Sequence, residues 1–158
     1  MKKAFNFRFP ILLLLILVVL GSSCITEKSQ NIEIVHQYYN ALISGDSSIA
    51  KTILSADFTK INNGKPEEPV GPKMLHKSIR NHQRRNSEYK YIIEEYFADE
   101  NFVAIRWRWK SINIKTGSPR KMDIPGLAIF KIDSGKIEKQ WQSFDMAMFE
   151  KQLFGGEQ

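Results

Sequence analysis

Asp145 is the ionisable residue whose surroundings in the sequence most favour chemistry. It follows Trp141 by four positions in a stretch with the period of a β-strand. Alternate residues of an extended strand point to the same face, so Ile137, Trp141 and Asp145 are predicted to share one. Two of the three are apolar, and an aspartate at an apolar pocket mouth would have its pKa raised above about 3.9. Such a carboxylate could take the proton next to a carbonyl group and leave an enolate. The simpler alternative is that Asp145 caps a helix beginning at Met146.

His82 is the second candidate for proton transfer. It falls on the apolar stripe of a helix predicted to start near Pro72, together with Leu75 and Ile79, and is therefore expected to face inward. An inward histidine could donate a hydrogen bond to a substrate oxygen or carry a proton. The structural alternative is a histidine at the edge of the core that bonds a backbone carbonyl.

Aromatic residues supply a candidate surface for a flat ligand. Trp107 and Trp109 alternate with basic residues, which predicts one aromatic and one basic face on their strand. An aromatic pocket is the functional interpretation of this pattern, and an aromatic core is the structural one. The residues that we expect to line such a pocket are Tyr38, Tyr39, Trp107, Trp109 and Trp141.

Composition argues against several other kinds of chemistry. The chain has 158 residues with a single cysteine and three scattered histidines, so neither a disulfide framework nor a recognised metal cluster is expected. It has no phosphate loop, no dinucleotide fingerprint and no nucleophile elbow. We therefore expect cofactor-independent, metal-free chemistry, or binding alone.

The first residues have the pattern of an export signal. A basic start precedes the apolar run Ile11–Leu20, whose ten residues rise only about 15 Å as a helix, too short for a bilayer core of roughly 30 Å. Small residues then lead into Cys24, an arrangement that resembles the bacterial lipoprotein signal, in which that cysteine is lipidated. The alternatives are an uncleaved membrane anchor and a secreted protein with a chance cysteine. We predict a signal peptide over residues 1–23, a tether over 24–30 and one domain over 31–158.

The predicted lipoprotein signal has consequences for the location and the partners of the protein. It implies a protein of the bacterial cell envelope, held in the membrane by its lipid and facing the periplasm or the exterior. The formal net charge of +6 falls to +3 once residues 1–23 are removed, because 20 basic residues then stand against 17 acidic ones. A nucleic-acid partner is therefore not expected.

Periodicity predicts helices first and strands after. Helical spacing covers residues 31–43, a second short helix spans residues 49–54, a short strand spans Asp57–Ile61, and a third helix begins near Pro72. Four strands joined by short turns follow, which requires an antiparallel meander, and a last amphipathic helix ends the chain. The predicted strands are Tyr89–Ala98, Phe102–Ile114, Met122–Asp133 and Lys136–Asp145. The order indicates an α+β fold whose helices cover one face of the sheet.

Several short segments carry a resemblance to a known family. They are Ser44–Asp46, Gly71, Val103–Trp107, Ile132–Glu138 with Trp141 and Asp145, and Gln152–Leu153. In this order they resemble the SnoaL-like polyketide cyclase, or ester cyclase, family of the nuclear transport factor two-like superfamily. The resemblance implies a cone-shaped, cystatin-like fold in which a curved antiparallel sheet wraps about three N-terminal helices.

The resemblance also implies a function. Asp145 matches the family aspartate that acts as general acid and base, with His82 or a tyrosine assisting. The expected activity is cofactor-free acid/base chemistry, of the cyclase, isomerase or lyase type, on a small hydrophobic carbonyl compound. The alternative is a non-catalytic module that binds a small ligand or a protein, including a second copy through the open face of the sheet.

Overall fold

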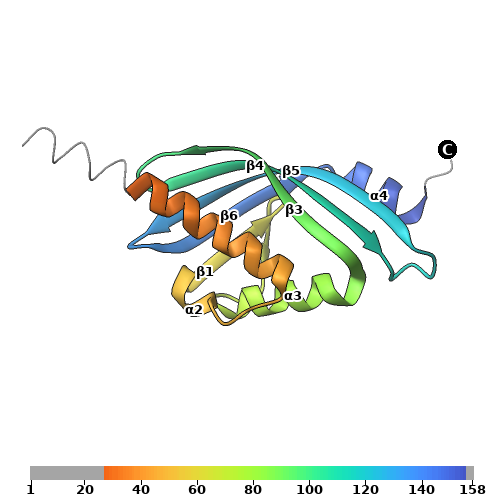
Figure 1. The fold of residues 1–158 in the computed structure, drawn as a ribbon, viewed down its shortest axis with the longest axis horizontal. Coiled ribbons are helices and arrows are strands. Elements are labelled where there is room, and N and C mark those ends of the chain that lie inside the picture. The colour runs from red at the N-terminus through yellow and green to blue at the C-terminus, as the bar shows by residue number, and fades with distance from the viewer. Residues whose placement is uncertain (1–26, 156–158) are drawn as a thin grey trace, which may run out of the picture.

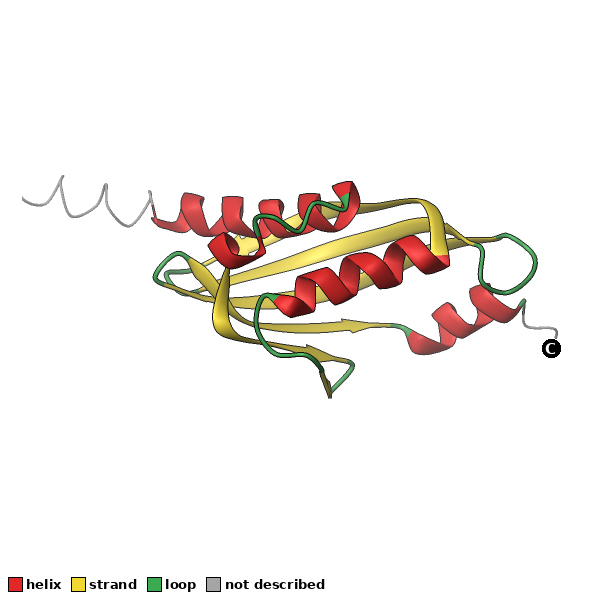
Figure 2. Ribbon diagram, turned by 90° about the horizontal axis from the view of Figure 1, so that it is seen from below, coloured by secondary structure: helices red, strands yellow, loops and turns green. Residues whose placement is uncertain are grey.

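A curved six-stranded sheet carries the helices against one of its faces (Figures 1 and 2). The structure is a computed structural model that describes residues 27–155. A helix over residues 27–44 comes first, and α4 follows the last strand. The other bounds are α2 Ala50–Ile53, β1 Leu54–Asn62, β2 Lys65–Glu67, α3 Lys73–Arg85, β3 Asn86–Ala98, β4 Phe102–Asn113, β5 Arg120–Asp133, β6 Lys136–Phe144 and α4 Met146–Phe154. The predicted α+β architecture and the β3–β6 meander are confirmed.

The sheet order places the first strand, β1, beside the last strand, β6. The strands run β2-β1-β6-β5-β4-β3, and β1 lies parallel to β6 while every other neighbouring pair is antiparallel. The parallel pair and the three-residue strand β2 were not predicted. Strand β2 lies between the predicted first strand and the predicted third helix, and its register sets Lys60 opposite Glu67.

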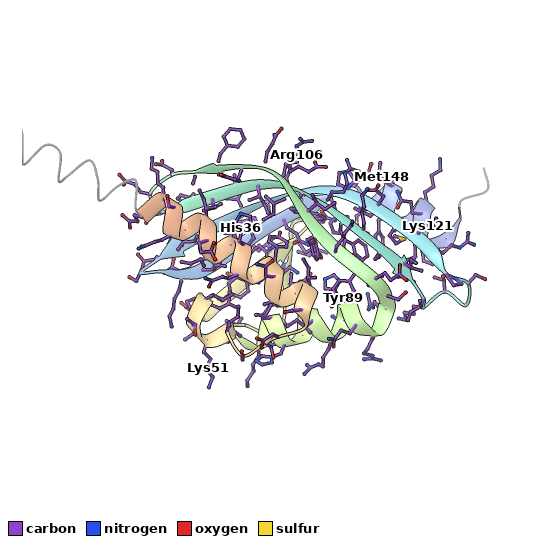
Figure 3. The ribbon with its side chains drawn as sticks, in the orientation of Figure 1. His36, Lys51, Tyr89, Arg106, Lys121 and Met148 are labelled. Atoms are coloured by element: carbon purple, nitrogen blue, oxygen red, sulfur yellow. The ribbon has the colours of Figure 1, made fainter. Side chains whose placement is uncertain are left out.

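Strand β4 follows the predicted alternation along its whole length. Trp107 and Trp109 are buried on the inner face, whereas the basic residues that alternate with them, Arg106, Arg108 and Lys110, face outward. Outside, Arg108 binds Glu94 and Asp123, each at 2.8 Å, and Arg106 points away from the helices (Figure 3). The predicted division into an aromatic and a basic face is confirmed.

Strand β6 does not keep its alternation. Adjacent residues of β5, Lys131 and Ile132, pair with Lys139 and Ile137, so Glu138 is an extra residue that bulges out of the ladder. A bulge shifts every later side chain to the opposite face. Gln140 is consequently buried, although it follows buried Ile137 by three positions.

Candidate active site

A cavity of about 660 Å³ opens between the inner face of the sheet and helices α3 and α4. This volume lies within the usual range of small-molecule sites, roughly 300–1,000 Å³. One part of its wall is apolar, formed by Trp107, Trp109, Ile124, Phe144, Phe149, Leu153 and Phe154. The remainder is polar and includes Lys60, Asn62, Glu67, His82, Arg85, Asn86, Tyr91, Asn113 and Gln142. The cavity therefore suits a ligand with an apolar body and a polar group.

His82 and Tyr91 form the first polar pair of the wall. His82 stands in the last turn of α3, and β3 follows that helix at once, which folds Tyr91 back onto it. The Tyr91 hydroxyl lies 3.0 Å from Nε2 of His82, and the imidazole stacks on Tyr89, a residue of β3 whose side chain points toward the helices (Figure 3). The inward orientation of His82 is as predicted, but its ring bonds a tyrosine rather than a backbone carbonyl.

The surroundings of this pair keep both groups uncharged. Burial, then the nearby cations of Lys60 and Arg85, lower the pKa of His82 from 6.5 to about 4, against an opposing effect of Glu67. Burial also raises the pKa of Tyr91 far above its ordinary value of 10.0. At neutral pH the site thus presents a neutral imidazole and an intact phenol, and the phenol can donate to a ligand oxygen when the imidazole proton is on Nε2.

Lys60 and Glu67 form the second polar pair. They are direct cross-strand partners on β1 and β2, so their side chains share the inner face, with Nζ and Oε2 3.6 Å apart. Lys60 is only 9% exposed, and burial lowers its pKa although Glu67 opposes that shift. Neither residue was predicted. The one signal in the sequence was the strand position of Lys60, which shares its face with the apolar Phe58.

A directed chain of hydrogen bonds holds the Glu67 carboxylate. The Tyr38 hydroxyl donates to Gln140 at 3.0 Å, and the Gln140 amide donates to Gln142 at 3.0 Å. Gln142 donates to Asn62 at 3.4 Å, and Asn62 donates to Glu67 at 2.9 Å. The chain runs from the core to the cavity wall and ends on the only carboxylate among the described lining residues.

The predicted aromatic residues divide into two groups. Trp107 and Trp109 line the cavity, and each has a buried indole N–H with no hydrogen-bond partner among residues 27–155. Tyr38 and Tyr39 belong instead to the core, at 0% and 3% exposure. Trp141 lies on the other side of its strand because of the bulge, with Lys139 Nζ 4.9 Å from its ring centre. The predicted places of Tyr38, Tyr39 and Trp141 in the pocket wall were therefore wrong.

The predicted place of Asp145 at a pocket mouth was also wrong. Asp145 is exposed, does not line the cavity, and caps α4 by accepting a hydrogen bond of 2.9 Å from the backbone N–H of Met148. The bulge in β6 removes the shared face with Ile137 on which the prediction depended. The capping alternative is the one that the structure shows.

In the described part of the chain, no three potential ligands of the His, Cys, Asp and Glu types come together as a metal site. No helix within residues 27–155 has both the length and the apolar character to cross a membrane. Cys24 and the predicted signal peptide lie outside the described residues.

The helix-covered curved sheet and its interior cavity define a cone-shaped α+β fold, and comparison with known proteins specifies the family. The model of the SnoaL-like polyketide cyclase family matches residues 32–153. The chain belongs to that family, as its sequence motifs predicted.

Solved structures share the fold at low sequence identity. TsrD from Streptomyces laurentii is 15% identical with a TM-score of 0.70, over 80% of this chain and 96% of that one. A putative SnoaL-like polyketide cyclase from Jannaschia sp. CCS1 is 12% identical with a TM-score of 0.71, over 83% and 96%. An LEH-like epoxide hydrolase from M. tuberculosis is 23% identical with a TM-score of 0.65, over 82% and 93%. No curated protein matched the chain.

Proposed function

We propose that the protein is a cofactor-independent enzyme that moves a proton next to the carbonyl group of a small, flat, hydrophobic compound. The observation that carries this proposal is the placement of a carboxylate, a neutral histidine and a tyrosine around one aromatic-walled cavity. Membership of a family named for polyketide cyclases supports the same class of chemistry.

Glu67 is the proposed base. It takes the place that the sequence had suggested for Asp145, because it is the carboxylate that lines the cavity within the described chain. The hydrogen bond from Asn62 fixes one carboxylate oxygen and leaves the other to Lys60 and the ligand. A positioned carboxylate of this kind can take the proton α to a carbonyl group.

Tyr91 and His82 are the proposed partners of the substrate oxygen. When the α-proton leaves, negative charge develops on the carbonyl oxygen. In the tautomer with the proton on Nε2, neutral His82 donates to the Tyr91 oxygen and leaves the phenol O–H to donate to the substrate oxygen. The unpartnered indole N–H groups of Trp107 and Trp109 are further donors that a ligand oxygen would satisfy. The apolar wall would orient the body of the ligand.

Proton exchange tests the proposal without knowledge of the natural substrate. A panel of aromatic and alicyclic ketones is incubated with the protein in D₂O, and loss of the α-proton signal is followed by NMR. We expect exchange above the buffer rate for at least one ketone, with a loss of about 10²-fold or more in Glu67→Gln and in Tyr91→Phe. Glu95→Gln, on the outer face, is the matched carboxylate control.

The opposite results would favour a binding module. If ketones bind, as seen by quenching of tryptophan fluorescence, but exchange no protons, then the cavity is a binding site without turnover. Equal exchange rates in the wild type and Glu67→Gln would remove Glu67 as the base.

A second copy of the chain is the proposed protein partner. The outer face of the sheet exposes Phe97, Leu127 and Ile129 at 74%, 60% and 46%. Phe97 and Ile129 both neighbour Ala104 across the ladder, so they form one apolar row. We expect a dimer in sedimentation equilibrium that Ile129→Lys converts to monomer. A wild-type monomer would contradict the dimer.

The membrane anchor remains a proposal as well. Cys24 would carry the lipid after cleavage behind residue 23, and the domain would sit at the surface of the cell envelope. We expect wild-type protein in the bacterial membrane fraction and Cys24→Ser in the soluble periplasmic or secreted fraction. Equal distribution of both would contradict lipidation at Cys24.

A further inference from the structure

We propose that Lys60 captures carbonyl ligands covalently, forming an imine between its Nζ and an aldehyde or ketone that enters the cavity. The observation behind this is the position of a lysine on the inner face of β1, 9% exposed, in a wall shared with Trp107, Trp109 and Phe144. The inference goes beyond the proposed proton transfer, because it assigns a nucleophile and a covalent intermediate.

The lysine is held in a way that leaves its nitrogen available. Its nearest carboxylate oxygen, on Glu67, lies at 3.6 Å, longer than the about 2.7–2.9 Å of a tight charge-assisted hydrogen bond. The neighbouring Asn62 bonds the other oxygen of the same carboxylate. Burial lowers the pKa of Lys60, although the charge and hydrogen bonding of Glu67 oppose the shift, and a lowered pKa is typical of lysines that act as nucleophiles.

The Lys60–Glu67 pair supplies the two species that imine formation requires. One proton passed from the ammonium to the carboxylate converts the pair into a free amine and a carboxylic acid. The amine attacks the carbonyl carbon, and a proton moves from nitrogen to oxygen, which gives a carbinolamine. The Glu67 carboxyl group then protonates the hydroxyl, water leaves as the C–O bond breaks, and the remaining nitrogen proton returns to Glu67. Amine and carbonyl thus become imine and water, with no oxidant or reductant.

Reductive trapping tests this with the full-length chain in mild detergent at pH 7. The probe is cinnamaldehyde, a flat apolar aldehyde, with sodium cyanoborohydride to reduce any imine to a stable amine. Intact mass spectrometry counts the added groups, and peptide mapping locates them. We expect labelling of Lys60 at least about tenfold faster than of any exposed lysine, because the cavity concentrates and orients the aldehyde. Cinnamyl alcohol, which has the same shape but no carbonyl group, should slow the labelling.

Variants give the expected and the contrary outcomes. Lys60→Arg keeps the positive charge and should abolish the fast label, whereas Lys51→Arg, an exposed lysine on α2 (Figure 3), should leave it unchanged. Fast labelling of Lys115 at the cavity rim, or label spread evenly over surface lysines, would overturn the proposal. Peptide mapping of the labelled wild-type protein distinguishes these outcomes even if Lys60→Arg folds poorly.

The proposed proton transfer and the proposed covalent capture can be refuted independently of each other. Tyr91→Phe should lose proton exchange but still be labelled at Lys60. A protein that exchanges α-protons without labelling would refute covalent capture alone, and one that is labelled without exchange would refute acid/base turnover alone.

Discussion

The indole of Trp107 lies directly against Gly126, its cross-strand partner on β5, and occupies the space where a Cβ atom would stand. The contact involves the six-membered part of the ring. It fixes how deeply this tryptophan enters the cavity wall, because any side chain on Gly126 would push it inward. Trp107 is 3% exposed and contacts Tyr91 and Phe144 edge-on, so a shift of the ring would be transmitted to both.

Gly126→Ala should therefore destabilise the fold and reduce the cavity. We expect a loss of about 1–3 kcal/mol in the free energy of unfolding, measured by denaturant titration, because the close-packed ring cannot move without disturbing its neighbours. Trp107→Phe removes the part of the ring that would clash. Gly126→Ala should therefore lower the free energy of unfolding less in the Trp107→Phe background than in the wild type. Equal costs in both backgrounds would contradict this steric explanation.

Acidification should weaken the fold through His82. Its pKa is about 4 in the folded protein against 6.5 ordinarily, so between these values the unfolded chain binds a proton that the folded chain does not. Stability contributed by neutral His82 is therefore complete above about pH 6.5 and falls as the pH drops toward 4, by up to about 3 kcal/mol. His82→Gln should flatten this part of the curve of unfolding free energy against pH. A wild-type curve that matches that of His82→Gln between pH 7 and 4.5 would contradict the prediction.

Loss of the hydroxyl group should affect stability differently at two neighbouring tyrosines, Tyr38 and Tyr39. Tyr38→Phe leaves the buried Gln140 oxygen without its donor and should cost about 1–3 kcal/mol of unfolding free energy. Tyr39 has a buried hydroxyl with no partner among residues 27–155, so Tyr39→Phe should be neutral or stabilising. Thermal and denaturant unfolding of both variants measure the contrast. Equal destabilisation would show that Tyr39 also has a hydrogen-bond partner.

Asp145 should matter for stability and not for proton exchange. Asp145→Ala removes the cap of α4 and should cost about 1 kcal/mol, whereas Asp145→Asn keeps a capping oxygen and should cost little. Both variants should exchange ketone α-protons at the wild-type rate. An Asp145→Asn protein that is stable but inactive would restore the role implied by the family resemblance.

The sequence predicts those elements in which one period runs without interruption. Strand β4 is regular over its whole length, so the inner positions of Trp107 and Trp109 follow from simple alternation. Helix α3 keeps its stripe through His82, which also faces inward as expected. In both elements a single local period sets which residues are buried.

The failures at Trp141 and Asp145 have one cause. A single extra residue in β6 reverses the faces, and β6 itself contains no glycine or proline that would mark it. Strand β2 was not predicted because it is three residues long, contains Pro66 and lies among turn-forming residues. Without β2 there was no partner for Lys60, and the polar side of the site could not be assembled from periodicity alone.

The parallel pairing of β1 with β6 also makes the completed sheet depend on the last strand of the chain. Asn62 and Gln142 meet across the sheet although they are 80 positions apart in the chain. In a chain that lacks β6, strand β1 would have no neighbour on that edge, and the side of the cavity formed by Lys60 and Glu67 would lose its connection to the rest of the sheet. The cavity therefore forms only when β6 joins the sheet, and a chain truncated before β6 would expose an unpaired strand, which favours aggregation.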